Sequence, residues 1–88
     1  METRELVVKN RLGLHARAAA KLVQAVEAYQ ADIRLVKGGE KADARSVLGL
    51  ISLGCAEGAG VTVEAEGADA LSAVMAVKNL FEEHFGEE

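Results

Sequence analysis

One histidine and one arginine stand where a helix is predicted to begin. His15 and Arg17 lie within residues 10–20, whose sequence is NRLGLHARAAA. The first backbone N–H groups of a helix have no partner inside it, and together with the helix dipole they favour anions such as phosphate. An imidazole at that point is a candidate acceptor of a phosphoryl group, which the helix end would partly neutralise. A guanidinium in the first turn suits phosphate oxygens.

The competing interpretation of His15 is purely structural. Judged from spacing alone, a lone histidine at a helix start is more often a cap or a partly buried side chain. Gly13 favours the functional interpretation, because it permits an unusual backbone angle that lets the ring project from the turn. Arg17 also favours the functional interpretation, since a cation at the positive end of the helix dipole suggests that an anionic ligand binds there. The alternative that Arg17 simply points into solvent stays open.

A second candidate site is Ser46, near the start of a short helix predicted over residues 44–53. Spacing alone favours an N-cap at this position. An exposed capping serine beside Arg45 and an apolar patch is also a suitable kinase acceptor. A phosphate there would lie at the helix N-terminus and add about two negative charges. It would therefore abolish docking to an acidic partner without unfolding the domain.

Other kinds of site find no support in the sequence. Only two histidines are present, His15 and His84, and there is no CxxC pair, so we expect no metal site. A GxSxG elbow and a P-loop are both missing, and no cofactor is expected. The single cysteine, Cys55, excludes an intrachain disulfide. Its apolar neighbours indicate a buried small hydrophobe rather than a reactive thiol.

Length and composition predict one small domain over residues 1–88, with an aliphatic, alanine-rich core. Half of the residues are apolar, but only Tyr29, Phe81 and Phe85 are aromatic. The formal net charge is −4, from 14 acidic and 10 basic residues, which argues against a nucleic-acid partner. There is no basic-then-apolar leader and no apolar run of membrane-spanning length. We therefore expect a cytoplasmic protein without membrane insertion.

Hydrophobic periodicity predicts the elements that position the two candidate sites. Alternation over residues 2–10 predicts a strand with Leu6 and Val8 facing inward, followed by a turn over residues 10–13. An amphipathic helix is predicted from residue 16 to about residue 30. Residues 33–37 and 40–43 predict a hairpin with an edge strand, and residues 61–66 predict a fourth strand. The longest helix is predicted over residues 68–85.

These helices have predicted inward faces. For the helix that follows His15 the inward residues are Ala19, Leu22, Val23 and Val26. For the last helix they are Leu71, Val74, Met75, Val77, Leu80 and Phe81. The helix over residues 44–53 is apolar nearly all round, so part of it is expected on a surface that a partner covers. Residues 86–88 are predicted to fray.

The predicted order is β-α-β-β-α-β-α. Alternating strands place polar residues on one face, which predicts a one-sided antiparallel sheet of four strands. All three helices would then lie on the other face. The predicted fold class is therefore α+β, an open-faced sandwich.

Two motifs at matching separation resemble one family. The motif NxxGLHARxAA, from Asn10 to Ala20, resembles the active-site signature of HPr. HPr is the histidine-containing phosphocarrier family of the bacterial phosphoenolpyruvate-dependent phosphotransferase system. The motif RSVLGL, from Arg45, resembles that family's second motif, around its regulatory serine. The glycine–strand–glycine segment over residues 54–67 also resembles the family, so the similarity covers essentially the whole chain.

The resemblance implies a phosphocarrier rather than a stand-alone enzyme. His15 would accept a phosphoryl group on Nδ1 from phosphorylated enzyme I, ultimately from phosphoenolpyruvate, and pass it to an enzyme IIA domain. Arg17 would assist this transfer, and the protein is expected to be a monomer. Ser46 would be phosphorylated by an HPr kinase/phosphorylase in those bacteria that possess one. The residues that match the family's exposed, partner-docking helix are Leu48, Gly49, Ile51 and Leu53.

The resemblance also leaves a second function open. Some relatives are regulatory interaction proteins of carbon or nitrogen metabolism that bind transcriptional regulators. Such a protein would act through Ser46 and the adjacent apolar helix. The presence of His15 favours the carrier. Family members devoted to nitrogen regulation share the histidine motif, so this motif does not separate the sugar branch from the nitrogen branch.

Two positions depart from the family pattern. Ala18 stands where many members have proline, a residue that the first turn of a helix tolerates but does not require. We expect this change to loosen the turn slightly and to leave the chemistry intact. Arg45 stands where lysine is common, which keeps the charge and changes its shape. Neither change touches His15 or Ser46.

Overall fold

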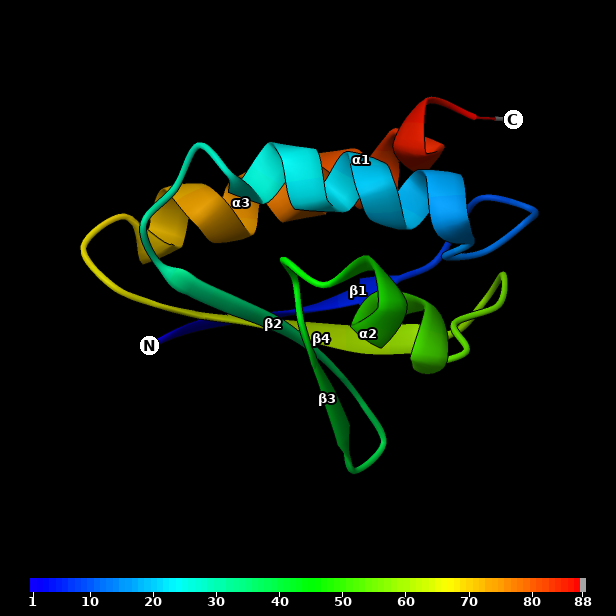
Figure 1. Cartoon of the computed structure of the whole chain (residues 1–88), viewed down its shortest axis with the longest axis horizontal. Coiled ribbons are helices and arrows are strands. Elements are labelled where there is room, and N and C mark those ends of the chain that lie inside the picture. Colours follow the sequence, from blue (N-terminus) through cyan, green and yellow to red (C-terminus); the bar gives the residue numbers. More distant parts are fainter. Residues whose placement is uncertain (88) are drawn as a thin grey trace.

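The computed structural model describes residues 1–87. It consists of a four-stranded antiparallel sheet with helices on one face (Figure 1). This architecture confirms the predicted α+β open-faced sandwich. The sheet order is β1-β4-β2-β3. The strands are β1 (Glu2–Val7), β2 (Asp32–Lys37), β3 (Glu40–Asp43) and β4 (Gly60–Glu66). The helices are α1 (Ala16–Val26), α2 (Val47–Ser52), α3 (Ala70–Glu82) and the short 3-10 helix η1 (His84–Gly86).

Alternation along the strands separates the core from the open face of the sheet. On β4, Val61, Val63 and Ala65 are buried against the helices. The intervening Glu64 lies on the open face, where its Oε1 accepts a hydrogen bond of 2.7 Å from Nε of Arg34 on the neighbouring β2. The strands therefore have the two-residue period of a half-buried sheet. The edge position predicted for β3 is confirmed.

The first helix ends earlier than its hydrophobic pattern predicts. It stops at Val26 rather than near residue 30, and the N–H of Tyr29 bonds back to the carbonyl of Val26 at 3.0 Å. The guanidinium of Arg45 donates to the carbonyls of Val26, Tyr29 and Ala31 at 3.2, 2.6 and 3.1 Å. A side chain distant in sequence thus satisfies the carbonyls at the helix end, which leaves the chain free to turn toward β2.

The last helix also differs from its prediction at both ends. It begins at Ala70 rather than at residue 68, and it ends at Glu82 rather than at residue 85, because His84 and Phe85 adopt positive φ angles of 58° and 53°. Leu71 was expected to face inward, but it is 57% exposed. The stripe facing the sheet instead runs through Ala70, Ala73, Val74, Val77 and Phe81. Leu71 lies at the flank of that stripe, because small alanines occupy the inward positions of the first turn.

The end of the chain returns to the start of α1. Figure 1 shows the segment after α3 beside the N-terminal end of α1, far from the point where α3 begins. Phe85 is fully buried, and the centroid of its ring lies 4.9 Å from the centroid of the Phe81 ring. The predicted fraying of residues 86–88 is therefore wrong for Gly86 and Glu87, which contact other parts of the fold. Residue 88 lies outside the described residues.

Candidate functional site

The turn before His15 is fastened to the loop that follows α2. Gly13 has a φ of +70°, in the left-handed region that favours glycine. A β-carbon there would also overlap the carbonyl oxygen of Cys55. The same carbonyl accepts a hydrogen bond of 2.8 Å from the N–H of Leu14. Both the backbone angle and this close approach therefore require a glycine at position 13.

His15 is the N-cap of α1. Its backbone is extended (φ −80°, ψ −179°), and its Nδ1 accepts a hydrogen bond of 3.2 Å from the N–H of Arg17. The carbonyl of His15 accepts the first helical hydrogen bond, from the N–H of Ala19 at 2.8 Å. The side chain remains 26% exposed. The capping interpretation is thus confirmed, and the same geometry aims Nδ1 at the first N–H groups of the helix, which have no acceptor within the helix itself.

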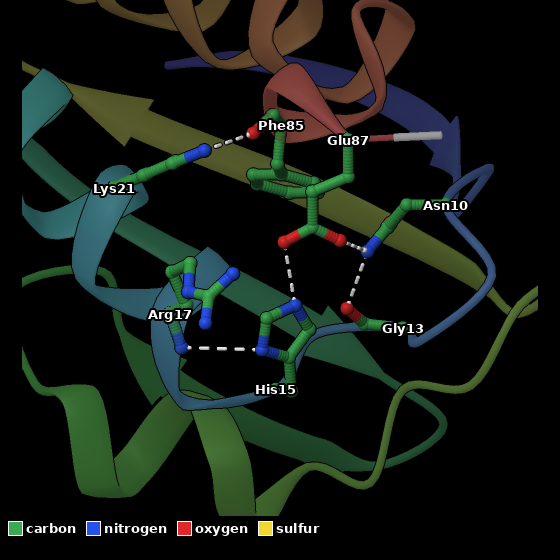
Figure 2. Close-up of polar contacts among 7 residues, drawn as sticks. All are labelled: Asn10, Gly13, His15, Arg17, Lys21, Phe85 and Glu87. Carbon is green, nitrogen blue, oxygen red and sulfur yellow. Dashed lines mark hydrogen bonds and ion pairs between the residues drawn. The ribbon is translucent and has the colours of Figure 1, made fainter.

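The other ring nitrogen faces a carboxylate. Nε2 of His15 lies 2.6 Å from Oε2 of Glu87, at the far end of the chain (Figure 2). A backbone N–H can only donate, so Nδ1 must accept from Arg17 with its lone pair. The proton of the neutral ring is then on Nε2 and is donated to Glu87. This arrangement leaves Nδ1 as the basic, nucleophilic nitrogen of the imidazole.

Asn10 ties the carboxylate to the turn. Its side chain is fully buried, and its Nδ2 donates both to the carbonyl of Gly13 at 2.6 Å and to Oε1 of Glu87 at 3.1 Å. Within residues 1–87, its Oδ1 has no hydrogen-bond partner. Burial by itself raises the pKa of the Glu87 carboxyl, but hydrogen bonds from Asn10 and His15, together with the electrostatic attraction of His15 and Lys21, outweigh burial and lower that pKa. Glu87 is therefore held as a carboxylate.

Lysine and aromatic contacts hold the chain end that carries Glu87. Nζ of Lys21, on α1, donates to the carbonyl of Phe85 at 2.6 Å. Sequence reasoning missed Glu87 and Lys21 as parts of this site, and it included Asn10 in the signature and its turn without giving its side chain a role. The terminal Phe85-Gly86 pair was the available signal, because a large apolar residue followed by glycine is typical of a docked helix end rather than a frayed one. No local pattern indicates where that end docks.

Arg17 is one of the residues that line an open depression, together with Glu87, the partner of His15. The depression has a volume of about 590 Å³, and Arg11, Leu12, Arg17, Gly86 and Glu87 line it. Arg17 is exposed, and no group among residues 1–87 bonds its guanidinium. An anion attached to Nδ1 would thus meet the helix end and would have a cationic side chain on the same first turn. The imidazole itself does not line the depression, but its side chain is 26% exposed and so remains accessible from outside.

The second predicted site forms the start of α2. Oγ of Ser46 accepts a hydrogen bond of 3.0 Å from the N–H of Gly49, so the predicted N-cap is confirmed. Ser46 is half-buried. The neighbouring Arg45 is committed to the carbonyls beyond α1, so its guanidinium is held away from a role as a free recognition cation.

The apolar residues of α2 divide between surface and core. Leu48 is 78% exposed and Ile51 is 38% exposed, whereas Gly49 is half-buried. Leu53 was expected on the exposed, partner-docking helix, but it is only 6% exposed and belongs to the core. It lies just beyond the last residue of α2, and the chain turn there directs its side chain inward. The exposed apolar surface of this helix therefore consists of Leu48 and Ile51.

Cys55 is buried, as its apolar neighbours predict. Burial raises the pKa of its thiol, although the nearby charge of Lys37 acts in the opposite direction. The raised pKa keeps the thiol protonated.

Within residues 1–87, no three His, Cys, Asp or Glu side chains gather closely enough to hold a metal ion. None of the helices in the same part of the chain is both long enough and apolar enough to span a membrane.

Known proteins match both the sequence and the fold. The family model of the PTS HPr component phosphorylation site matches residues 2–83. The phosphocarrier protein HPr of Xylella fastidiosa is 40% identical over 84 residues, which cover 96% of this chain and 94% of that protein. The phosphocarrier protein NPr of Shewanella violacea is 42% identical over 84 residues, with coverage of 96% and 92%. A crystal structure of HPr from Thermoanaerobacter tengcongensis superposes with a TM-score of 0.95 at 40% identity, covering 100% of this chain and 99% of that one.

Proposed function

This chain belongs to the HPr family of phosphocarrier proteins, and on that premise we propose that it carries a phosphoryl group on Nδ1 of His15. The donor is phosphorylated enzyme I, supplied from phosphoenolpyruvate, and the acceptors are enzyme IIA domains. The observation that carries this proposal is the contact between Nδ1 and the N–H of Arg17 at the start of α1. The protein acts as an intermediate, with residues 1–88 as one carrier domain and without catalysis of its own.

The transfer step uses the lone pair of Nδ1. It attacks the phosphorus atom held by the donor, a new N–P bond forms, and the bond between phosphorus and the donor atom breaks with its electrons returning to the donor. The N–H of Arg17 and the positive end of the α1 dipole then face the phosphoryl oxygens. The guanidinium of Arg17 lies on the same first turn and balances part of the charge.

An exposed phosphorylation site suits a carrier better than an enclosed binding site. The group must stay on His15 long enough to diffuse, and it must still leave when an acceptor arrives. The imidazole is 26% exposed, and its neighbours Arg17 and Glu87 line an open depression, which supports access by two different partner proteins. A closed site with many donors would bind the phosphoryl group too tightly for onward transfer.

The decisive experiment supplies radiolabelled phosphoenolpyruvate and purified enzyme I to the parent chain and to His15→Ala. The parent should acquire acid-labile phosphate, whereas the variant should acquire none and should retain the unfolding midpoint of the parent to within a few degrees. His84→Ala is the matched control, because it removes the other histidine and should still acquire phosphate. Unchanged acid-labile incorporation in His15→Ala would refute the proposal.

A regulatory function through Ser46 is the second proposal. Phosphorylation of Ser46 by an HPr kinase/phosphorylase would place charge beside the exposed Leu48 and Ile51, which form the apolar surface of α2. The strong exposure of Leu48 favours this function, because an apolar side chain so exposed beside a modifiable serine suits a docking surface. Transcriptional regulators of carbon or nitrogen metabolism are the proposed partners of that form.

The remaining properties follow from the family and from the composition. We propose a cytoplasmic monomer that binds its partners transiently and binds no nucleic acid. The net charge of −4 and the few aromatic residues support the last point. Sedimentation equilibrium at micromolar concentration tests the oligomeric state, and a mass of two chains would contradict the proposed monomer.

A further inference from the structure

We infer that Glu87 is a positioning residue for phosphoryl transfer, whose carboxylate keeps the ring proton on Nε2 of His15 and so leaves Nδ1 as the nucleophile. The inference rests on the proposed role of His15 and adds a residue to it. Figure 2 shows the carboxylate between the imidazole and Asn10, with one oxygen directed at each. The contact joins residues that are 72 positions apart in the sequence.

The carboxylate is oriented by donors on both sides. Oε2 lies 2.6 Å from Nε2 of His15, and Oε1 accepts from Nδ2 of Asn10 at 3.1 Å. The Glu87 side chain is only 16% exposed, although it belongs to the end of the chain. Asn10 is itself fully buried and bonded to the carbonyl of Gly13. The position of the carboxylate is therefore set relative to the turn that carries His15.

The segment before Glu87 adopts an unfavourable backbone in order to reach this place. His84 and Phe85 both have positive φ angles, which residues other than glycine rarely adopt. Burial of Phe85 against Phe81 and the hydrogen bond from Lys21 to the Phe85 carbonyl offset that cost. Such strain persists where surrounding contacts impose it, and it clusters at functional sites. Here its consequence is to deliver a carboxylate to the imidazole.

The contact has a chemical effect in both steps of transfer. Before transfer, a carboxylate on Nε2–H favours the tautomer in which Nδ1 carries the lone pair, as carboxylate–imidazole pairs do elsewhere. After Nδ1 has bonded to phosphorus, the ring bears a positive charge that the carboxylate balances. When an acceptor attacks phosphorus, the P–Nδ1 bond breaks and its electrons return to Nδ1. The ring proton stays on Nε2 throughout, so no proton has to enter or leave.

The test measures the tautomer and the transfer rate in the same set of variants. In ¹⁵N-histidine spectra at a pH where the ring is neutral, the parent should be almost wholly the Nε2–H form. Glu87→Ala should show a larger share of Nδ1–H, and its phosphorylation by enzyme I should be slower by roughly tenfold or more. Glu87→Gln keeps an acceptor oxygen without the charge, so it should retain most of the tautomer preference and part of the rate.

Glu82→Ala is the matched control. Glu82 lies on α3, pairs with Lys78 at 3.4 Å and carries the same charge, so its loss should leave both the spectrum and the rate unchanged. A parental tautomer ratio in Glu87→Ala, or an altered ratio with a parental rate, would overturn the inference. Either result is distinct from failure of the carrier function, which only phosphate uptake by His15→Ala would reveal.

Discussion

The carbonyl oxygen of Cys55 occupies the space that a β-carbon on Gly13 would need, and the same oxygen accepts a hydrogen bond of 2.8 Å from Leu14. The turn that presents His15 is thus built directly on the loop after α2. A chain with any side chain at position 13 must move one of these segments away from the other. Such a movement would carry the imidazole with it.

We predict that Gly13→Ala lowers the free energy of unfolding by roughly 2–4 kcal/mol, because backbone strain and overlap add. Phosphate uptake by His15 should fall as well, since its turn shifts. Gly38→Ala is the control: Gly38 also has a positive φ, of 60°, but no atom lies within 4 Å of the added carbon. Urea unfolding of both variants provides the comparison, and equal losses would mean that the Cys55 contact is unimportant.

For Arg17 the expected effect is on rate and not on stability. Arg17→Ala should slow phosphorylation by enzyme I by roughly tenfold or more, because one cation facing the transferred group is lost. Its unfolding midpoint should match that of the parent, since no group among residues 1–87 bonds the guanidinium. Arg11→Ala, which removes a charge from the same depression but outside the helix, should have the smaller effect on rate. A larger effect at Arg11 would contradict the role given to Arg17.

Substitutions at Ser46 should separate capping from charge. Ser46→Ala loses the hydrogen bond to Gly49 and should cost about 1 kcal/mol of stability while leaving transfer from enzyme I intact. Ser46→Asp keeps a capping oxygen and adds a negative charge, so it should be nearly as stable as the parent and should transfer more slowly. Rapid-quench phosphorylation and urea unfolding measure the two effects. Identical transfer rates for Ser46→Asp and the parent would remove the regulatory proposal.

The carboxyl of Glu87 should make stability depend on pH in the acid range. Burial alone would raise its pKa, but the hydrogen bonds from Asn10 and His15 and the electrostatic attraction of His15 and Lys21 together prevail, and the pKa in the folded chain is lower than its usual value. The folded chain therefore binds this proton less readily than the unfolded chain. The stabilisation is complete above the usual pKa of a glutamate and is lost as pH falls through the lowered one.

Comparison with Glu87→Gln isolates this contribution, because the other titrating groups are common to both chains. The difference in unfolding free energy between the parent and Glu87→Gln should be constant near neutral pH and should shrink as the solution is acidified below the usual glutamate pKa. Urea titrations across that range measure it. A difference that grows on acidification would show that the pKa is shifted in the opposite direction.

Arg45 should be more important for stability than for recognition. Its guanidinium donates to three carbonyls at and just after the end of α1, those of Val26, Tyr29 and Ala31. Lysine carries the same charge on a single amine and cannot match the planar fork. We predict that Arg45→Lys lowers the free energy of unfolding by about 1–2 kcal/mol. A variant as stable as the parent would mean that these hydrogen bonds add little.

Features that depend on near neighbours follow from the amino-acid sequence alone. Alternation of apolar and polar residues specifies the faces of β2 and β4, and the spacing of Leu22 and Val26 specifies the inward face of α1, because these periods reflect backbone geometry. The capping position of Ser46 and the helix start at His15 are also local, since a cap bonds N–H groups only two or three residues away.

Contacts between groups that are distant in the sequence become visible only in the folded chain. The contact of Glu87 with His15 depends on the left-handed turn at His84 and Phe85 and on the buried Phe85 ring, and no local pattern encodes that path. The early end of α1 likewise depends on Arg45, and the burial of Leu53 depends on where the chain turns after α2. Periodicity tells which residues share a face, whereas the free energy of burial and of long-range hydrogen bonds selects the partners those faces find.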